Sequence, residues 1–151
     1  MDRRNFLIIG AAATALAGRA AAQGQRSRIE AYKSPTCGCC SAWVDRMDKA
    51  GFDITAQNID QEQLWALKER SGIVPDISGC HTAFVDDYVI EGHVPASDIE
   101  RLLAERPEAI GLAVPGMPIG APGMDMGNRR EAFDTLLVLP DGTTEVFQSH
   151  A

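Results

Sequence analysis

The sequence of 151 residues predicts one α/β domain that ends in a C-terminal β-hairpin. Strand-like and helix-like stretches follow each other in the order β-α-β-α-β-β-α, and the pair Cys37-x-x-Cys40 falls between the first strand and the first helix. This order, with the cysteine pair in that place, is typical of a thioredoxin-like fold. A loop rich in Gly, Pro and Met then interrupts regular structure before the final hairpin.

The first 22 residues have the composition of an export signal. Arg3 and Arg4 precede an almost wholly apolar run over residues 6–17, and residues 20–22 supply an A-x-A cleavage site. The arginine pair favours the twin-arginine route. A membrane anchor is less favoured, because the apolar run is about a dozen residues and a bilayer needs roughly 20. We therefore expect a cleaved signal peptide over residues 1–22 and a periplasmic domain over residues 23–151 that is not bound to the membrane.

The charge of this expected mature domain argues against polyanionic partners. The leader carries Asp2, Arg3, Arg4 and Arg19, so its removal takes the formal net charge from −7 to −9. A domain this acidic is a poor candidate for binding nucleic acid or anionic membrane surfaces. The charge suits a soluble protein that handles small cations, although surface acidity usually serves only solubility.

The helix that follows the first strand places three cysteines in its loop and first turn. Trp43, Met47 and Ala50 recur at helical spacing after Cys40, and Gly51 ends the helix. At a helix N-terminus the free backbone N–H groups and the helix dipole favour a thiolate over a thiol.

The remaining elements are predicted from the same rules. Asp60 is expected to cap a helix that runs through Arg70, and Asp86 and Asp87 are expected to turn a β-hairpin. The expected strands cover residues 29–32, 52–56, 82–85, 88–91, 135–139 and 143–147, and a third helix covers residues 97–105. The Gly/Pro/Met-rich residues 111–127 are expected to form a long loop with neither regular helix nor central strand.

Four cysteines carry the predicted chemistry. In a thioredoxin-like arrangement the loop before the third strand lies against the first helix, so Cys80 is expected beside Cys37, Cys39 and Cys40. Two disulfides are the default in an oxidising compartment, but the crowding argues against them, because adjacent cysteines bridge only with strain. Staggered thiolates suit several bridged metal ions better than one tetrahedral zinc, and Cu(I) is the favoured ion.

Methionines in the long loop are candidate outer ligands. Met117 and Met124, together with Met126, offer thioethers, which are soft ligands at any pH. Packing of the loop onto the core explains these methionines equally well.

Two histidines are further candidate ligands. His81 follows Cys80 directly, so on a strand the two side chains would point to opposite faces. His93 lies between the expected hairpin and the third helix. His150, at the C-terminus, is expected to be disordered.

Several blocks over nearly all of residues 23–151 match one pattern. They are YKSPTCGCC (residues 32–40) with Trp43, CHTA (80–83), YVIEGHVP (88–95) and GLAVPGMP (111–118), followed by Gly120, Pro122, Gly123 and Met124. In these blocks the chain resembles the CopG-like copper-resistance family, small exported bacterial proteins long described as a domain of unknown function. That family is unrelated to the DNA-binding repressors of the same name. Two departures, Ala121 where serine is common and the added methionine of Asp125-Met126, leave the cysteines untouched.

The resemblance implies a thioredoxin-like domain that holds several copper ions through bridging Cys37, Cys39, Cys40 and Cys80, with His and Met as outer ligands. We therefore expect a periplasmic copper-binding protein of a copper-resistance system that holds a multinuclear Cu(I) cluster. Conversion between Cu(I) and Cu(II), or transfer of copper to a partner, would be its further roles. Periplasmic copper chaperones or efflux components are the expected protein partners.

Two other functions are compatible with the same cysteines. A thiol–disulfide oxidoreductase would use Cys37 as nucleophile and Cys40 as resolving thiol, but it gives Cys39 no role. A structural zinc or iron–sulfur module is the third interpretation.

Overall fold

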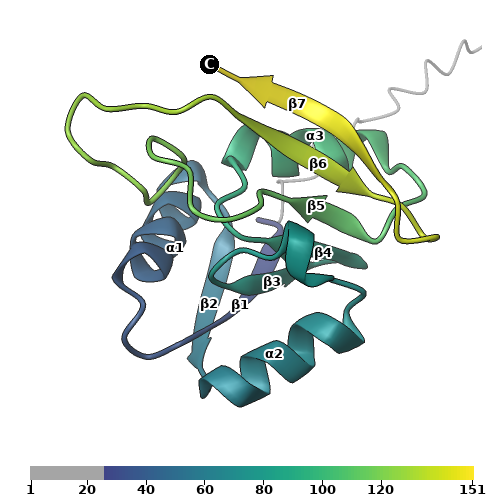
Figure 1. Cartoon of the computed structure of the whole chain (residues 1–151), viewed down its shortest axis with the longest axis horizontal. Coiled ribbons are helices and arrows are strands. Elements are labelled where there is room, and N and C mark those ends of the chain that lie inside the picture. The colour runs from purple at the N-terminus through teal and green to yellow at the C-terminus, as the bar shows by residue number, and fades with distance from the viewer. Residues whose placement is uncertain (1–25) are drawn as a thin grey trace, which may run out of the picture.

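The computed structural model describes residues 26–151, which form one seven-stranded sheet with helices on both faces (Figure 1). The strand order is β2-β1-β3-β4-β5-β6-β7. The pairs β1–β2 and β4–β5 are parallel and the other pairs are antiparallel. The elements are β1 (Arg28–Lys33), α1 (Gly38–Ala50), β2 (Asp53–Asn58), α2 (Gln61–Arg70), η1 (Pro75–Ile77), β3 (Thr82–Val85), β4 (Tyr88–Glu91), α3 (Ala96–Glu105), β5 (Gly111–Ala113), β6 (Phe133–Val138) and β7 (Thr144–His150). The predicted α/β class is confirmed.

Two hydrophobic cores cover the two faces of the sheet. Trp43 of α1 and Leu102 of α3 pack in one cluster with Ile90 of β4. Val89, the neighbour of Ile90 in the same strand, belongs instead to a second cluster with Ile77 of η1. Because successive strand residues point to opposite faces, α1 and α3 cover one face and the η1 segment covers the other.

The first two helices end and begin as the sequence predicts. Gly51 follows α1 with φ of 102°, a left-handed conformation that glycine adopts without steric cost, and its N–H bonds the last carbonyls of the helix. Asp60 caps α2 through a capping box, in which its side chain accepts from Gln63 N at 2.8 Å and Gln63 Oε1 accepts from Asp60 N.

The prediction that residues 111–127 contain no central strand is wrong for the first three of them. Residues Gly111–Ala113 form β5, which pairs with β4 on one side and β6 on the other. A Cβ on Gly111 would lie 1.8 Å from the carbonyl oxygen of Val89, so glycine is there to allow close approach of two backbones. Three buried residues are too few to show the alternation that marks a strand. Residues 114–127 are irregular, as predicted.

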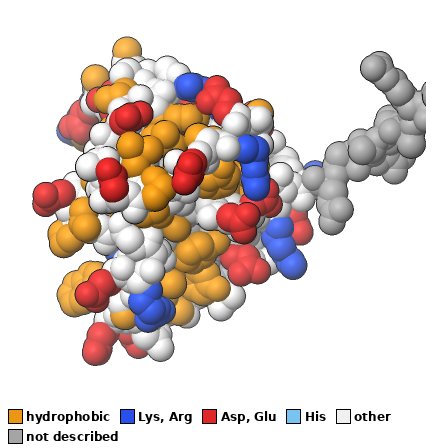
Figure 2. Space-filling view, turned by 90° about the vertical axis from the view of Figure 1, so that its right-hand side faces the viewer, with side chains coloured by type: hydrophobic (Ala, Val, Ile, Leu, Met, Phe, Trp, Pro, Cys, Tyr) orange, Lys and Arg blue, Asp and Glu red, His pale blue; other side chains and the backbone are white. Residues whose placement is uncertain are grey.

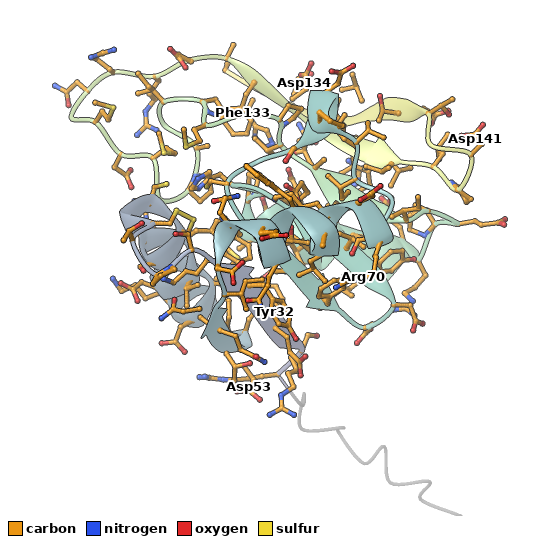
Figure 3. The ribbon with its side chains drawn as sticks, turned by 60° about the horizontal axis from the view of Figure 1, so that its bottom comes forward. Tyr32, Asp53, Arg70, Phe133, Asp134 and Asp141 are labelled. Atoms are coloured by element: carbon orange, nitrogen blue, oxygen red, sulfur yellow. A yellow bond between two sulfur atoms is a disulfide. The ribbon has the colours of Figure 1, made fainter. Side chains whose placement is uncertain are left out.

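The C-terminal hairpin is confirmed and is longer than predicted. Asp141 lies at its tip (Figure 3) and accepts hydrogen bonds from the N–H and hydroxyl of Thr143. The prediction that His150 is disordered is wrong. His150 is the last residue of β7. Its Nε2 lies 2.8 Å from Asp98 Oδ2, and its ring stacks on Phe133 with centroids 4.6 Å apart.

The export and periplasmic location of the protein stay predictions. Within residues 26–151 no helix has the length and apolar character to cross a membrane. The expected signal peptide, residues 1–22, lies outside the described residues.

Candidate metal centre

The N-terminus of α1 presents the first three cysteines. Cys37 is the N-cap residue, with extended φ and ψ of −79° and 96°, and its Sγ accepts a hydrogen bond from Cys40 N at 3.3 Å. A sulfur here takes the place that an oxygen side chain usually holds at an N-cap. Cys40 is fully buried, whereas Cys39 is partly exposed. The helix start therefore places two sulfurs next to each other and leaves the third open to a neighbouring segment.

Cys37 and Cys40 are joined in a disulfide, and Cys39 and Cys80 are free thiols. Thiolate ligation by all four cysteines, as the sequence analysis predicts, therefore requires a two-electron reduction of this bond first. The pair is also the one that the oxidoreductase interpretation uses.

Cys80 brings its sulfur to this cluster from the segment before β3. Its Sγ lies 3.4 Å from Cys40 Sγ and 3.7 Å from Cys39 Sγ, and Cys37 and Cys39 are 3.6 Å apart. The four sulfur atoms all lie within 4.8 Å of one another. The predicted convergence of Cys80 on the first loop is confirmed.

Two histidines approach Cys80 as well. His93 Nε2 lies 2.9 Å from Cys80 Sγ, and His93 Nδ1 donates to the carbonyl of Pro122 at 2.7 Å. His81 Nδ1 lies 3.5 Å from the same sulfur. Both residues precede β3, so the alternation of faces expected on a strand does not apply to them. Cys80, His81 and His93 thus form a second group of potential ligands within 4.8 Å.

Burial controls the protonation of these groups. Desolvation, together with the nearby Cys39, raises the pKa of Cys80 to about 12, so its thiol keeps its proton at neutral pH. Desolvation lowers the pKa of His93 and lowers that of His81 well below its usual value. Since Nδ1 of His93 donates to a carbonyl, its Nε2 carries a lone pair that accepts from the Cys80 thiol. Binding of a metal by Cys80 would displace this proton.

The donor set fits a soft metal ion. Thiolate sulfur with imidazole nitrogen is the combination that copper and zinc prefer. The fully buried His81 also has a ring nitrogen, Nε2, with no hydrogen-bond partner among the described residues. A buried polar atom without a partner is costly. The ring is wedged between Trp43 and His93, with ring centroids at 4.5 and 5.1 Å.

The loop of residues 114–127 lies against this centre without bringing every predicted ligand to it. Pro122 contacts His93, and a Cβ on Gly123 would lie 2.7 Å from both Cys39 O and Trp43 N, so the loop is pressed onto α1. Met124 is partly buried beside these residues, whereas Met117 is 53% exposed. Ligation by either thioether stays a prediction.

Lys68 and Glu91 lie next to the centre and were not predicted from the sequence as part of it. Both are buried and form an ion pair, and Glu91 Oε1 accepts a hydrogen bond from the N–H of Gly79, the residue before Cys80. Burial raises the pKa of Glu91, and Lys68 opposes that rise. A carboxylate at the end of an otherwise apolar strand, two residues before His93, was the available sign in the sequence.

One groove of the described residues lies away from the cysteines. It has a volume of about 690 Å³, lies between α2 and η1, and is lined by Trp65, Lys68, Val74 and Ser78 among others. On the side of the molecule shown in Figure 2, acidic and basic side chains surround hydrophobic ones. A metal centre needs converging ligands rather than a large cavity, so the sulfur cluster remains the candidate site.

Comparison with known proteins places this centre in a family. The sequence model described as "Protein of unknown function, DUF411" matches residues 77–124, a range that holds Cys80, His81 and His93. The structure is similar to a copper resistance protein CopG (Form 2), with 35% identity, a TM-score of 0.78, and coverage of 84% of this chain and 100% of that one. The chain belongs to the CopG copper-resistance family.

A second form of CopG gives the same relationship. It is 36% identical, covers 83% of this chain and 98% of that chain, and has a TM-score of 0.77. No curated protein sequence matches the chain. The resemblance inferred from the cysteine, histidine and Gly/Pro blocks is thereby confirmed.

Proposed function

We propose that this CopG-family protein binds copper in a periplasmic copper-resistance system, on a thioredoxin-like scaffold. Its ligands would be Cys37, Cys39, Cys40 and Cys80, which would bridge several Cu(I) ions as a multinuclear cluster. The observation that carries the proposal is the convergence of four sulfur atoms within 4.8 Å from two separate segments. The copper-resistance role in the names of the two similar structures supports the choice of metal.

Soft-ligand chemistry supports Cu(I) as the ion. Thiolate ligands select Cu(I). Cys39 Sγ lies 3.6 Å from Cys37 Sγ and 3.7 Å from Cys80 Sγ, so after reduction of the disulfide it would be placed to share its sulfur between two ions. His93 and His81 would complete the coordination on the side of Cys80. Met117 and Met124 would serve as outer ligands on the covering loop. Interconversion of Cu(I) and Cu(II), and transfer to a periplasmic chaperone or efflux component, are roles that this cargo would allow.

The order of strands β2-β1-β3-β4 supports the thioredoxin-like scaffold. Its first two strands are parallel and joined by α1, and β3 runs antiparallel to β1. The cysteine motif at the start of α1 faces the segment before β3 in this arrangement. The twin-arginine leader supports export to the periplasm.

Anaerobic titration of the reduced mature domain with Cu(I) tests the proposal. We expect saturation above one copper per chain, and a lower stoichiometry in both Cys39→Ser and Cys80→Ser, because a bridging sulfur serves more than one ion. Saturation below one copper per chain, or unchanged stoichiometry in either variant, would contradict the cluster. Metal analysis of protein recovered from its native compartment would separate copper from zinc and iron–sulfur alternatives.

A thiol–disulfide oxidoreductase is the second candidate, and the Cys37–Cys40 disulfide at the start of α1 favours it. This function needs only those two cysteines. Disulfide reduction that survives both Cys39→Ser and Cys80→Ser would support it over the copper cluster.

A further inference from the structure

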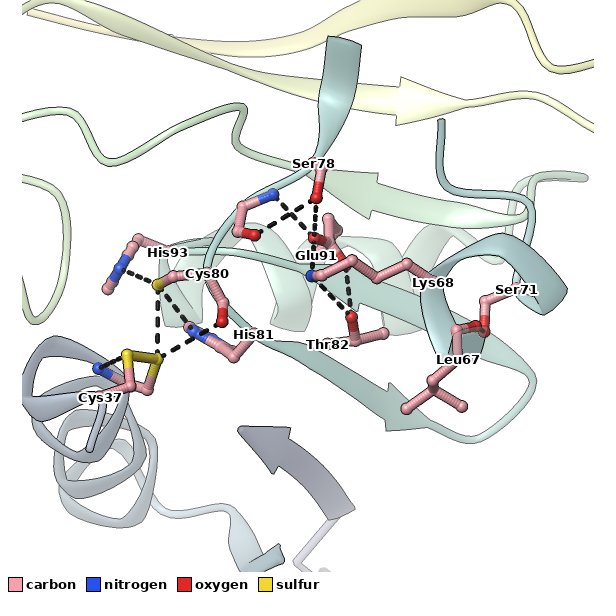
Figure 4. Close-up of polar contacts among 12 residues, drawn as sticks. Cys37, Leu67, Lys68, Ser71, Ser78, Cys80, His81, Thr82, Glu91 and His93 are labelled. Carbon is pink, nitrogen blue, oxygen red and sulfur yellow. Dashed lines mark hydrogen bonds and ion pairs between the residues drawn. A yellow bond between two sulfur atoms is a disulfide. The ribbon is translucent and has the colours of Figure 1, made fainter. Parts of the chain in front are cut away.

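The segment that carries Cys80 and His81 is tied to one fully buried carboxylate (Figure 4). Glu91 Oε1 accepts from Gly79 N at 2.7 Å and from Ser78 Oγ at 3.4 Å, and Glu91 Oε2 accepts from Thr82 Oγ1 at 2.7 Å. These donors lie on both sides of Cys80 in the chain. A single side chain thus bonds the residues that precede and follow this part of the metal centre.

Lys68 of α2 balances the charge of that carboxylate. Its ammonium group forms the buried ion pair with Glu91 and donates to Thr82 Oγ1 at 3.0 Å. A buried ion pair is weak evidence for stability, since desolvation of both charges offsets most of their attraction. Here both carboxylate oxygens and the ammonium group are hydrogen-bonded, so the network has one satisfied arrangement.

The backbone around this network leaves little room for adjustment. A Cβ on Gly79 would lie 2.5 Å from Gly92 Cα, and the N–H of Gly92 donates to the carbonyl of His81 at 2.9 Å. Gly92 stands between Glu91 and His93. The contacts of Glu91 therefore help to fix the positions of both Cys80 and His93, whose Sγ and Nε2 atoms lie 2.9 Å apart.

We propose that Glu91, charge-balanced by Lys68, is the positioning residue of the metal centre. It touches no ligand atom and acts through Gly79, Ser78 and Thr82, holding Cys80 against His93 and the sulfurs of α1. The part of this inference that concerns copper rests on the proposed function. The part that concerns the position of Cys80 stands without it.

The test uses Glu91→Gln with a matched control elsewhere in the fold. Asp98 on α3 is also a buried acid, accepting from Thr135 Oγ1 at 2.6 Å and lying 2.8 Å from His150 Nε2. Its partners belong to the C-terminal hairpin and to its own helix, not to a cysteine segment. Asp98→Asn therefore reproduces the loss of a buried charged acceptor without touching the metal centre.

Alkylation of Cys80 in copper-free protein, followed by peptide mass mapping, measures its position directly. We expect Glu91→Gln to raise the alkylation rate of Cys80 about tenfold and Asp98→Asn to leave it unchanged. The double variant Glu91→Gln/Lys68→Met removes both charges and should keep the acceleration. Equal rates in Glu91→Gln and Asp98→Asn would overturn the proposal, because the effect would not be specific to the carboxylate that bonds the Cys80 segment. An acceleration that disappears in the double variant would overturn it too, because the unpaired charge of Lys68 would then be the cause.

Copper binding provides the second readout. We expect Glu91→Gln to weaken Cu(I) binding by about 10–100-fold, the usual effect of changing a residue that orients a metal ligand, and to shift the sulfur-to-copper absorption band. Asp98→Asn should show neither change. If the wild-type protein binds no copper, the proposed function fails while the alkylation experiment still decides the role of Glu91. Should Glu91→Gln fail to fold, Thr82→Val removes the bond to Glu91 Oε2 together with the bond that Thr82 accepts from Lys68, and leaves the bonds of Gly79 and Ser78 to Oε1 in place. Unchanged Cys80 alkylation in Thr82→Val would overturn the proposal.

Discussion

Cys80 is the residue on which the two groups of ligands meet. Its sulfur lies 3.4 Å from Cys40 Sγ on one side and 2.9 Å from His93 Nε2 on the other. Burial is the largest cause of its raised pKa, which reaches about 12 against an ordinary 9.0. The protonated thiol is therefore a poor nucleophile and a poor metal ligand until a metal or a reaction partner takes its proton.

The pH dependence of Cys80 alkylation checks this pKa. In Cys39→Ser, with the Cys37–Cys40 disulfide intact, Cys80 is the only free cysteine of the chain. The reaction follows the thiolate fraction, so we expect its rate to rise about tenfold per pH unit and to keep rising above pH 9.0. The substitution removes the contribution of Cys39 to the raised pKa, but burial remains. A rate that levels off near pH 9.0 would contradict a buried, protonated thiol.

At the scale of elements, α2 carries Lys68 to the carboxylate beside the metal centre, and a local capping motif fixes where this helix begins. Its start is set by the capping box of Asp60 and Gln63, and its last turns carry Lys68 to the buried Glu91. The helix is only ten residues long, so its ends contribute a large share of its stability.

We expect Asp60→Ala to lower the free energy of unfolding by about 1 kcal/mol, because the N–H of Gln63 loses its acceptor. Urea unfolding followed by circular dichroism measures the change. Glu62→Ala is the control, since it removes an exposed carboxylate from the same turn without touching the cap. Losses of equal size in the two variants would mean that the capping box adds nothing.

The elements that the sequence predicted well are those whose signals are local. The helical spacing of Trp43 and Met47, and the capping residue Asp60, can be recognised from a few neighbouring residues of the sequence. By contrast, β5 depends on a close approach of Gly111 to Val89, 22 positions earlier in the chain. No local pattern records such a contact, so the strand was missed.

At the scale of the whole molecule, sheet order explains the site. Because β3 pairs with β1, the segment before β3 comes to the start of α1, and Cys80 was correctly placed from topology alone. The roles of Glu91 and Lys68 could not be placed in the same way. Their pairing joins α2 to β4 across the sheet, and such side-chain partners follow from packing rather than from chain order.

The covering loop adds a third segment to the site, and Gly123 is the point at which it meets α1. Gly123 has φ of +87°, and a Cβ there would collide with Cys39 O and Trp43 N at 2.7 Å. Gly127, in the same loop, has φ of +63° but nothing within 4 Å of its Cβ position. The two glycines therefore share a left-handed backbone and differ only in the contact with the helix.

Alanine substitutions at the two glycines can therefore distinguish the cost of backbone strain from the cost of displacing the loop from α1. We expect Gly127→Ala to cost about 1–2 kcal/mol, the usual penalty for a left-handed side chain. Gly123→Ala should cost a further 1–3 kcal/mol, about the value for an overpacked contact, because the loop must lift from α1. Urea unfolding measures both losses, and hydrogen exchange should show faster exchange of the amides around Met124 in Gly123→Ala alone. Equal unfolding losses and equal exchange in the two variants would mean that the loop does not bear on α1, and the covering role assigned to its methionines would lose its structural basis.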